Sequence, residues 1–439
     1  MSVASGASPA SGEPRRTELV RREPAETVER ADRACLVAAF VLTLAWFFAF
    51  DHFRPDYLVD ESGHLGAIYH FLEGKPGWPE QMTMLPGYHY IVVALWKLHP
   101  PLKLLTLTRL VTTLTAFVTL AGFALAWRKL HQRPSGAATL MLALLPILQP
   151  FTGLAYSDVP ALAFVFLAVA THLANRRFAA ALLFAAATFI RQTNLAWVAF
   201  LLAWEFLRPD APRRDFFLRT RWLLLLCALA AGTVLYAGRL TPGTQTGTAL
   251  SPNIATLHFA GVLVLLLGLP VWLAHLPAAF RAWRERMWAR EPRAVLITGL
   301  AFFAVAALAL TFKNPHAWNR EFFWDDGKFS LLRNWPLIYI DIHPWLRIAS
   351  GLNLVLMAAA LVVAFARQPR RRELWLTLAF GALLPLTNNL VEPRYFITPV
   401  VFILLFLEPT TADTRRLTVW WFLLCALHAP FIARGVSLW

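Results

Sequence analysis

Apolar segments long enough to cross a lipid bilayer recur along this chain of 439 residues. A helix of about 20 apolar residues spans the roughly 30 Å hydrocarbon core. Hydrophobic residues make up 58% of the sequence, against about 45–50% in soluble globular domains. The sequence therefore predicts an all-α polytopic membrane protein with about 11–14 transmembrane helices. The expected spans are 34–50, 105–127, 137–152, 158–174, 178–190, 192–207, 221–238, 257–276, 294–312, 345–366, 373–390, 395–408 and 416–433.

The first 33 residues differ in composition from everything that follows. They are rich in Pro, Ser, Glu and Arg, and they contain no apolar run that could form the core of a signal peptide. We expect residues 1–33 to form a disordered cytoplasmic tail and residues 34–439 to form one transmembrane domain. The pair Arg15-Arg16 lies far from the first span and is not interpreted as a twin-arginine signal.

The net charge of +15 arises from basic residues that occupy alternate loops. Under the positive-inside rule these loops are cytoplasmic, which places the amino terminus inside and the carboxyl terminus outside a cell (inner) membrane. The basicity thus indicates topology, and no nucleic-acid partner is expected. The residues are Arg128, Lys129 and Arg133; Arg176 and Arg177; Arg208, Arg213, Arg214, Arg219 and Arg221; Arg281, Arg284, Arg286, Arg290 and Arg293; Arg367, Arg370, Arg371 and Arg372; and Arg415 and Arg416.

The intervening loops collect the other polar groups on the opposite, outer face. This one-sided distribution predicts a site at the outer membrane interface, and the alternative is a solvated cluster of loop charges. The outer loops carry Asp60, Glu61 and His64; Tyr156 and Asp158; Arg191, Gln192 and Asn194; Thr244 to His258; residues 313–344; and Asn388, Asn389, Glu392 and Arg394.

A short amphipathic helix is expected in the first outer loop. Leu65, Ile68, Tyr69 and Leu72 follow helical spacing and form one apolar stripe. Such a helix can lie in the headgroup plane, although simple packing against the protein also explains the stripe. Asp60 and Glu61 would then precede its positive end, which favours the ionised carboxylates.

Five motifs in the outer loops carry a resemblance to a known family. The motifs are Asp60-Glu61-x-x-His64, Trp78 to Leu85-Pro86-Gly87, Tyr156-Ser157-Asp158, Arg191-Gln192-Thr193-Asn194-x-x-Trp197, and Leu390-Val391-Glu392-Pro393-Arg394-Tyr395-Phe396. In order and content they resemble motifs of the dolichyl-phosphate-glucose-dependent α-1,2-glucosyltransferases, which add the last glucose to the lipid-linked oligosaccharide of N-glycosylation. The resemblance extends thinly from Asp60 to about Pro399, and it implies a GT-C type fold with an outer-face active site. The Arg- and Ala-rich composition looks bacterial, which favours a shorter polyprenyl phosphate over dolichol.

Three departures from the family pattern put the acceptor in doubt more than the reaction. Where the family has Trp-Asp-Pro, this chain has Trp78-Pro79-Glu80. The family's Gly-Asp before His258 is replaced by Gly243-Thr244-Gln245. A family block with Asp-Asn-Arg-His-Tyr has no clean counterpart, although Asp325, Asp326, Arg333 and Asn334 occupy that region.

A sugar on a lipid phosphate needs two opposite charges for its transfer. A carboxylate deprotonates the acceptor hydroxyl, and an arginine holds the departing phosphate through two hydrogen bonds. The resemblance implies a first-loop acidic base and inversion at the anomeric carbon. Asp60 is preferred over Glu61 as the base, the other positioning the acceptor; Arg394 is the preferred phosphate ligand and Arg191 the second candidate. The remaining expected substrate-binding residues are His64, Trp78, Tyr156, Asp158, Gln192, Asn194, His258, Glu392 and Tyr395.

No cofactor is expected, although a divalent ion on Asp60, Glu61 and His64 is an alternative. The donor loses a single phosphate, which an arginine can neutralise. Cys35, Cys227 and Cys425 lie inside expected spans, so neither a disulfide nor a zinc site is predicted. The cysteines are interpreted as small apolar residues.

The predicted activity is transfer of a hexose, glucose by resemblance, from a polyprenyl- or dolichyl-phosphate donor to a glycan or lipid-linked glycan. A nucleotide sugar is not the expected donor, because no Gly-rich phosphate loop follows a strand. Two other classes remain open, a lipid-glycan transporter or flippase and a polymerase or ligase of surface glycans. Transporters typically carry charges near the bilayer midplane and two related halves, and neither feature is evident here.

Overall fold

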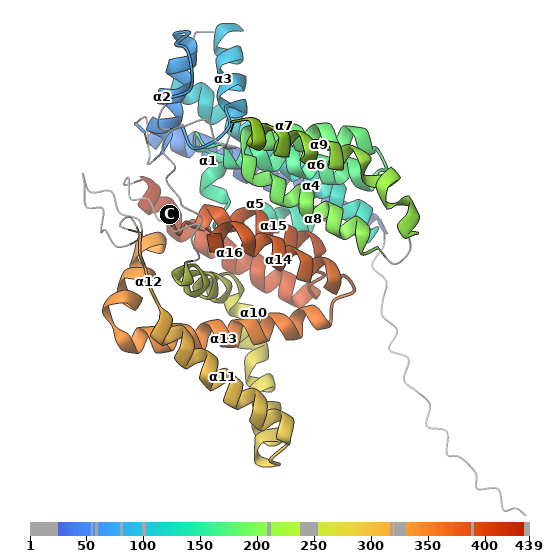
Figure 1. Cartoon of the computed structure of the whole chain (residues 1–439), viewed down its shortest axis with the longest axis vertical. Coiled ribbons are helices and arrows are strands. Elements are labelled where there is room, and N and C mark those ends of the chain that lie inside the picture. Colours follow the sequence, from blue (N-terminus) through green and yellow to red (C-terminus); the bar gives the residue numbers. More distant parts are fainter. Residues whose placement is uncertain are drawn as a thin grey trace, which may run out of the picture.

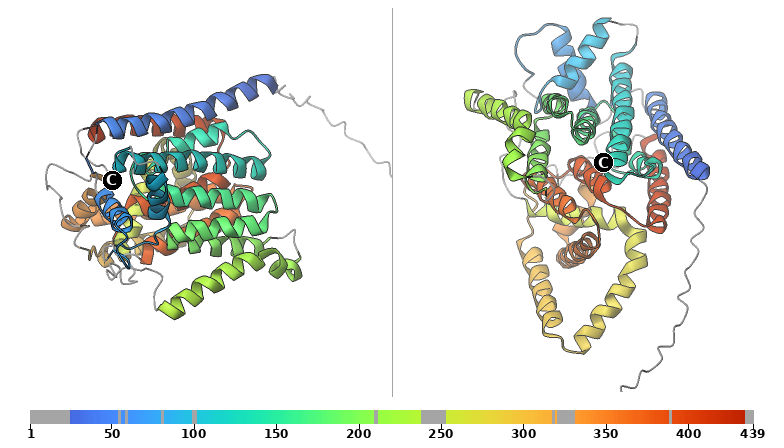
Figure 2. Two further views of the ribbon diagram at one scale, coloured as in Figure 1. Left: turned by 90° about the horizontal axis from the view of Figure 1, so that it is seen from above. Right: turned by 90° about the vertical axis from the view of Figure 1, so that its right-hand side faces the viewer.

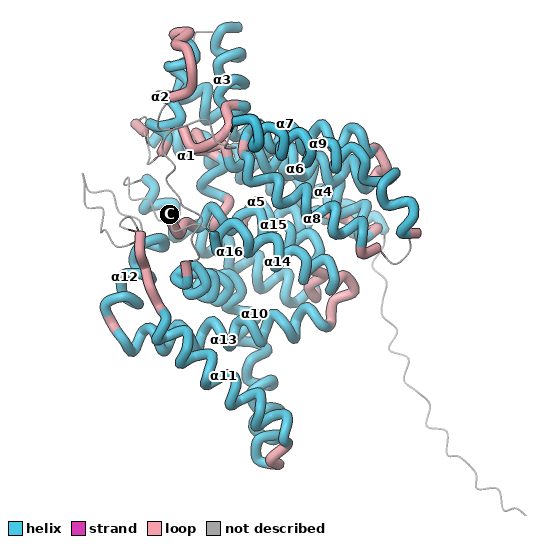
Figure 3. Tube along the Cα trace, in the orientation of Figure 1, coloured by secondary structure: helices cyan, strands magenta, loops and turns pink. Residues whose placement is uncertain are grey.

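The computed structural model describes residues 25–53, 56–57, 60–79, 82–98, 102–208, 212–237, 253–316, 319, 331–387 and 390–433. Throughout these ranges the regular secondary structure is helical, without strands (Figure 3). The α-helices are α1 (Ala25–Phe53), α2 (Glu61–Leu72), α3 (Gly87–Leu98), α4 (Leu104–His131), α5 (Gly136–Ala143), α6 (Asp158–Leu173), α7 (Arg177–Ile190), α8 (Leu195–Phe206), α9 (Phe216–Ala237), α10 (Ile254–Trp288), α11 (Pro292–Thr311), α12 (Leu331–Ile342), α13 (Pro344–Ala366), α14 (Arg371–Thr387), α15 (Ile397–Phe406) and α16 (Thr411–Ala433). Short 3-10 helices include η1 (Gln149–Thr152), η2 (Gln192–Asn194), η3 (Arg213–Asp215) and η6 (Pro393–Phe396).

The predicted all-α membrane architecture is confirmed. Six of the described helices are long and apolar enough to cross a bilayer, namely α1, α4, α9, α10, α11 and α13. Every expected span except one coincides with a helix. The exception is 137–152, where α5 ends at Ala143 and turns lead to η1. Pro146 and Pro150 explain the break, because proline lacks the N–H that a continuing helix needs.

Part of the segment expected to be an amino-terminal tail is helical in the structure. Helix α1 begins at Ala25, inside the segment 1–33, while residues 1–24 lie outside the described part of the chain. Glu26 forms an ion pair with Arg30, and Glu29 forms one with Arg33, in each case one helical turn further along α1. Pairs with this spacing stabilise an exposed helix end, so charged residues that looked like tail extend the first helix.

Aromatic side chains fill the centre of the bundle. Helix α8 packs against α14, and α15 contacts both α14 and α4 (Figure 1). Trp197 of α8 stacks on Phe402 of α15 with 4.3 Å between ring centroids. Phe166 and Phe200 pack against the same Phe402 ring from α6 and α8. This buried aromatic cluster fixes α6, α8 and α15 relative to one another, and all three helices adjoin motifs of the predicted outer face.

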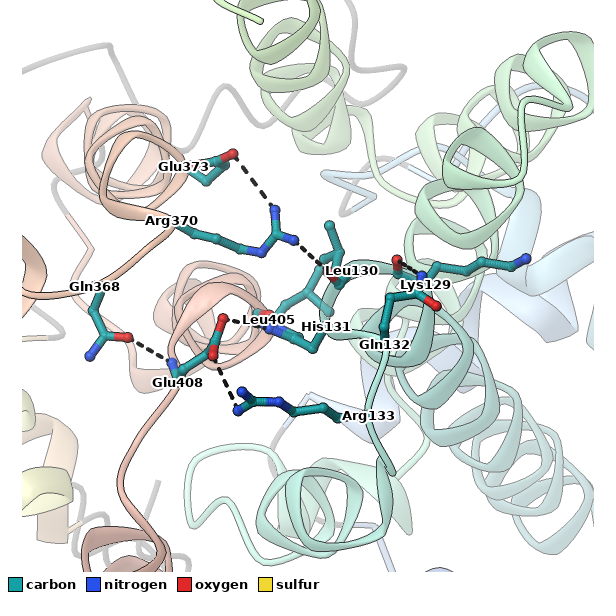
Figure 4. A network of polar contacts seen from close by, with 10 residues as sticks. All are labelled: Lys129, Leu130, His131, Gln132, Arg133, Gln368, Arg370, Glu373, Leu405 and Glu408. Carbon is teal, nitrogen blue, oxygen red and sulfur yellow. Dashed lines mark hydrogen bonds and ion pairs between the residues drawn. The ribbon is translucent and has the colours of Figure 1, made fainter. Parts of the chain in front are cut away.

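One end of the bundle holds the basic loops. His131 at the end of α4 contacts Glu408 at 3.0 Å and donates to the carbonyl oxygen of Leu405 at 2.8 Å (Figure 4). Arg128 pairs with Asp32 of α1 at 2.8 Å. A second cluster at the ends of α6 and α8 joins Glu205 to His172, Arg208 and Arg219. Basic residues from several of the alternate loops therefore lie at one end, where acidic side chains partner them.

Helices α2 and α3 lie at the opposite end and cross the direction of the bundle (Figures 1 and 2). Leu65 and Ile68 of α2 are buried against Tyr88 and Val92 of α3. Tyr69, expected on the packed stripe, is 48% exposed. The predicted amphipathic helix is thus present, and it packs on α3 while it presents Tyr69 outward.

Candidate functional site

The neighbouring carboxylates Asp60 and Glu61 have opposite environments. Asp60 immediately precedes α2, and its side chain is 49% exposed. Glu61 begins α2 and is fully buried, where Arg109 of α4 donates to both carboxylate oxygens at 2.9 and 2.7 Å. Asp60 is therefore accessible to a substrate. Glu61, expected to act as base or to position the acceptor, faces the protein interior.

Arg394 lies at the centre of the candidate site. It is part of η6, directly before α15, and its Nη1 atom lies 2.9 Å from Oδ2 of Asp60. Its Nε atom pairs with the buried carboxylate of Glu392. The guanidinium carbon also lies 5.5 Å from the ring centroid of Tyr156 and 5.7 Å from that of Tyr395. Two carboxylates and two aromatic faces thus fix the orientation of this one cation.

Tyr156 connects Asp60 to the same cluster. Its hydroxyl oxygen accepts a hydrogen bond of 3.0 Å from the backbone N–H of Asp60. Burial raises the pKa of the Tyr156 phenol well above its usual value, and the negative charge of Asp60 raises it further. The phenol therefore stays neutral at physiological pH, and its proton remains available to donate to a further acceptor.

Asp158 and Arg191 form a second ion pair beside the first. Their closest atoms, Oδ2 and Nη1, are 2.7 Å apart, and both side chains are mostly buried. Asp158 is the first residue of α6, where the positive helix end favours its carboxylate. Arg191 follows α7 and also donates to the hydroxyl of Ser157 at 3.4 Å. Ser157 is the residue between Tyr156 and Asp158, so the two ion pairs belong to one site.

His64 lies behind Tyr156 as half of a buried histidine pair. Its Nδ1 atom is 3.1 Å from Nε2 of His89, and its ring centroid is 5.5 Å from that of Tyr156. Burial lowers the pKa of His64 well below its usual value, and His89, Arg394 and Arg191 lower it further. Burial also lowers the pKa of His89 to about 4. Both rings are therefore neutral near pH 7, and their contact needs one donor and one acceptor nitrogen.

Four other residues expected to bind substrate lie at the edge of this cluster or away from it. Gln192 donates to the carbonyl oxygen of Thr83 at 2.9 Å. Asn194 is buried and donates to the carbonyl oxygen of Ala187 in the last turn of α7. Trp78 packs near Phe71 and Tyr90 and is 42% exposed. His258 is buried against Ser350 and Phe312, so it joins α10 to neighbouring helices.

Several residues of the sequence argument lie outside the described part of the chain, namely Glu80, Gly243, Thr244, Gln245, Asp325, Asp326, Asn388 and Asn389. The structure also does not describe the side chains of Arg333 and Asn334. The departures from the family pattern therefore remain sequence observations.

Arg109 is the functional candidate that sequence reasoning missed. It lies within the expected span 105–127 and was counted as part of an apolar helix. A charged residue inside a membrane-length segment is costly unless it is paired, and it commonly marks a functional site. That signal was present in the sequence, but the sequence alone does not identify Glu61 as its partner.

The possible metal ligands Asp60, Glu61 and His64 do not converge. Glu61 is bound by Arg109, Asp60 faces Arg394, and His64 faces His89. Within the described ranges, no group of three His, Cys, Asp or Glu side chains is arranged to hold a metal ion. All three cysteines are free thiols.

The site thus combines an exposed carboxylate with two oriented arginines. Asp60 can accept a proton from a hydroxyl group that approaches from its exposed side. Arg394 and Arg191 offer guanidinium groups suited to planar, bidentate recognition of an anion. A phosphate that reaches Arg394 has to compete with Asp60 for the Nη1 atom.

Comparison with known proteins finds a match to a family model over the first part of the chain. Residues 54–215 match the model of the DIE2/ALG10 family. No curated protein matches the chain significantly. Two solved structures of ArnT from Cupriavidus metallidurans are similar to it. The apo structure is 15% identical, with a TM-score of 0.36 over 90% of this chain and 77% of that chain. The structure bound to undecaprenyl phosphate is 14% identical, with a TM-score of 0.35 over 93% and 80%.

The family match covers four of the residues that build the site, namely Asp60, Tyr156, Asp158 and Arg191. DIE2/ALG10 is the α-1,2-glucosyltransferase family that the sequence motifs resemble. The predicted resemblance of this chain to that family is therefore confirmed over residues 54–215.

Proposed function

We propose that this protein is a membrane glycosyltransferase that moves a hexose, glucose by family resemblance, from a polyprenyl phosphate to a glycan acceptor. The contact between Asp60 and Arg394 carries the proposal. It places a solvent-accessible carboxylate 2.9 Å from an oriented guanidinium group. Transfer from a sugar phosphate needs these two charges, one for the acceptor proton and one for the leaving phosphate.

In the proposed reaction, Asp60 is the general base. Its carboxylate takes the proton of the acceptor hydroxyl while that oxygen bonds to the anomeric carbon of the sugar. The bond between the anomeric carbon and the phosphate oxygen breaks, and the electron pair leaves with the polyprenyl phosphate. Attack from the face opposite the phosphate inverts the configuration at the anomeric carbon.

Arg394 holds the phosphate in this scheme, with Arg191 as a second ligand. Because the carboxylate of Asp60 lies 2.9 Å from Nη1 of Arg394, an incoming phosphate takes its place at this atom. Binding of the donor phosphate therefore frees the Asp60 carboxylate to act as the base. The phosphate gains two charge-assisted hydrogen bonds from the planar guanidinium group.

The motifs also support the outer face as the place of reaction. Asp60, Asp158, Arg191 and Arg394 lie at the end of the bundle opposite the basic loops, which under the positive-inside rule are cytoplasmic. We therefore propose an inside amino terminus and an outside carboxyl terminus. A reporter fused after residue 210 or 370 is expected in the cytoplasm, and one fused at 320 or after 439 outside. Reversed signals at 210 and 320 would remove the shared outer face.

Purified protein in detergent tests the activity directly. We expect it to consume polyprenyl-phosphate glucose in the presence of a glycan acceptor and to leave UDP-glucose unchanged. Chelation of divalent ions is expected to leave the rate unaltered, because arginines neutralise the single phosphate. Transfer from the nucleotide sugar with no lipid donor present would contradict the proposal.

A further inference from the structure

The ion pair between Glu61 and Arg109 lies directly behind Asp60. Both side chains are fully buried, and Nε and Nη2 of Arg109 reach the two carboxylate oxygens of Glu61 at 2.9 and 2.7 Å. This parallel, two-bond arrangement fixes both the distance and the relative orientation of the two groups. Since Asp60 directly precedes Glu61 in the chain, the ion pair also restrains the backbone of Asp60.

The same ion pair is hydrogen-bonded to the backbone at three further places. Arg109 donates to the carbonyl oxygens of Phe50, near the end of α1, and Asp56, at 3.2 and 3.0 Å. The carboxylate of Glu61 accepts a 2.7 Å hydrogen bond from the N–H of Ala155. Arg109 therefore ties α4 to the end of α1 and to the start of α2. Glu61 ties the start of α2 to the loop that contains Tyr156.

The bond to Ala155 matters because Tyr156 follows immediately. The Tyr156 hydroxyl accepts the backbone N–H of Asp60, so the donor and the acceptor of that hydrogen bond are each one residue away from an atom held by the ion pair. A shift of Glu61 would move Asp60 and Tyr156 together. The carboxylate of Asp60 would then change its position relative to Arg394.

Stability alone is a weak explanation of such a pair. Two charges removed from water carry a large desolvation penalty, and well-packed apolar residues often stabilise a protein as much or more. A buried pair can instead specify one geometry among several. The location of this pair, one residue from the exposed carboxylate, points to that purpose.

We propose that Glu61 and Arg109 are a positioning pair that holds the Asp60 carboxylate in its reactive position, and that Glu61 itself does not touch the substrate. This inference rests on the proposed function, in which Asp60 is the base. It extends the site to Arg109, and it gives different tasks to the two adjacent acids.

Steady-state kinetics of Glu61→Gln and Arg109→Lys test the positioning role. We expect kcat to fall by roughly 10²-fold, the cost typical of a displacement of about 1 Å at a reacting group. The KM for polyprenyl-phosphate glucose is expected to stay near the wild-type value, because Arg394 and Arg191 are untouched. Arg109→Lys keeps the positive charge but loses the two-bond geometry. A loss of kcat in this variant therefore comes from the changed position of Glu61 and Asp60 and not from a change of charge.

Glu205→Gln is the matched control. Glu205 is a buried carboxylate at the other end of the bundle, where it pairs with Arg219 at 3.0 Å. We expect this variant to lose thermal stability while its kcat remains that of the wild type. A kcat for Glu61→Gln no lower than that of Glu205→Gln would overturn the proposal, as would a raised donor KM with unchanged kcat.

Folding failure and failure of the proposed function are separated by two further measurements. If the single variants do not fold, the double variant Glu61→Gln with Arg109→Gln is used instead, because it buries no charge at this place. If the double variant also fails to fold, the pair serves stability alone and the proposal is overturned.

Labelling of Asp60 by a water-soluble carbodiimide needs no turnover. We expect labelling to accelerate in Arg109→Lys and not in Glu205→Gln, and equal rates would overturn positioning even where no transfer is found.

Discussion

Asp60 and Arg394 meet across the candidate site as an ion pair with 2.9 Å between Oδ2 and Nη1. One partner precedes α2 and the other precedes α15, so the contact joins the start of α2 to a motif near the end of the chain. The Asp60 side chain is 49% exposed, whereas that of Arg394 is 14% exposed. The carboxylate is thus the partner that can leave the contact, and the arginine is the fixed one.

Removal of the fixed partner is predicted to affect donor binding and turnover together. In Arg394→Ala, the phosphate loses an attraction that is present before the reaction and becomes stronger as the leaving group gains charge. Arg394→Lys should recover only part of the activity, because an ammonium group cannot make the planar two-bond contact. Donor affinity and kcat measured for each variant check this expectation.

Arg347→Ala provides the matched control for the arginine variants. Arg347 pairs with a carboxylate, Asp341, at 3.5 Å and lies 5.6 Å from the ring of Phe312. Like Arg394, it therefore has a carboxylate and an aromatic ring as neighbours, but it is not part of the candidate site. Unchanged donor affinity in Arg394→Ala, or an equal loss in Arg347→Ala, would argue against Arg394 as the phosphate ligand.

Loss of one hydroxyl group at Tyr156 is predicted to slow transfer. In Tyr156→Phe the N–H of Asp60 loses its acceptor while the aromatic ring beside Arg394 remains. A lost hydrogen bond of this kind costs about 1–2 kcal/mol, which corresponds to roughly tenfold in kcat if it falls on the transition state. Steady-state assays of the purified variant measure this effect.

Tyr88→Phe separates the position of the hydroxyl from its burial. The Tyr88 hydroxyl is also buried and contacts Thr112 at 2.8 Å, but it is not bonded to Asp60. We expect Tyr88→Phe to reduce stability and to leave kcat unchanged. The opposite ranking of the two variants in kcat would contradict the role given to Tyr156.

Acid is predicted to destabilise helices α2 and α3 through the buried histidines His64 and His89. Burial lowers the pKa of His89 to about 4, whereas an unfolded histidine titrates near pH 6.5. The unfolded state therefore binds more protons between these values, so the free energy of unfolding falls as the pH falls from about 6.5 towards 4. The contribution of His89 is fully present above about pH 6.5, and its loss amounts to about 3 kcal/mol.

The slope of stability against pH measures this contribution. Thermal unfolding of His89→Gln in detergent should depend less on pH between 4 and 7 than that of the wild type, because glutamine does not titrate. His70→Gln, on the partly exposed side of α2, is the control. An unchanged slope in His89→Gln would show that this histidine is not held neutral.

Hydrophobic pattern and loop charge were enough to predict which residues share an end of the bundle. Asp60, Asp158, Arg191 and Arg394 were all assigned to one face, and the structure joins them in two ion pairs. Each of these residues lies beside the end of a helix. Two of them are therefore predicted to share a side of the membrane when an even number of spans lies between them. That information is contained in local apolar runs.

The direction in which a side chain points from its helix could not be predicted from the sequence and is seen only in the structure. Adjacent Asp60 and Glu61 look alike in sequence, and only the position of α4 turns Glu61 inward to Arg109. Asn194, expected in a binding role, donates to the carbonyl oxygen of Ala187 in the last turn of α7, a contact that the sequence did not predict because a side-chain amide has many possible partners. These outcomes depend on tertiary packing, which spacing along the chain does not specify.

The central claim is that Asp60 is the general base and that the donor phosphate releases it from Arg394. The variant Asp60→Asn tests this claim most directly when transfer and donor binding are measured on the same preparation. The account predicts that transfer falls by about 10²–10⁴-fold, while the affinity for polyprenyl-phosphate glucose is retained or increased because the competing charge is gone. Glu73→Gln, which removes a similarly exposed carboxylate at the other end of α2, should match the wild type in both. Near-normal transfer by Asp60→Asn, or a loss of donor binding as large as the loss of transfer, would contradict the account.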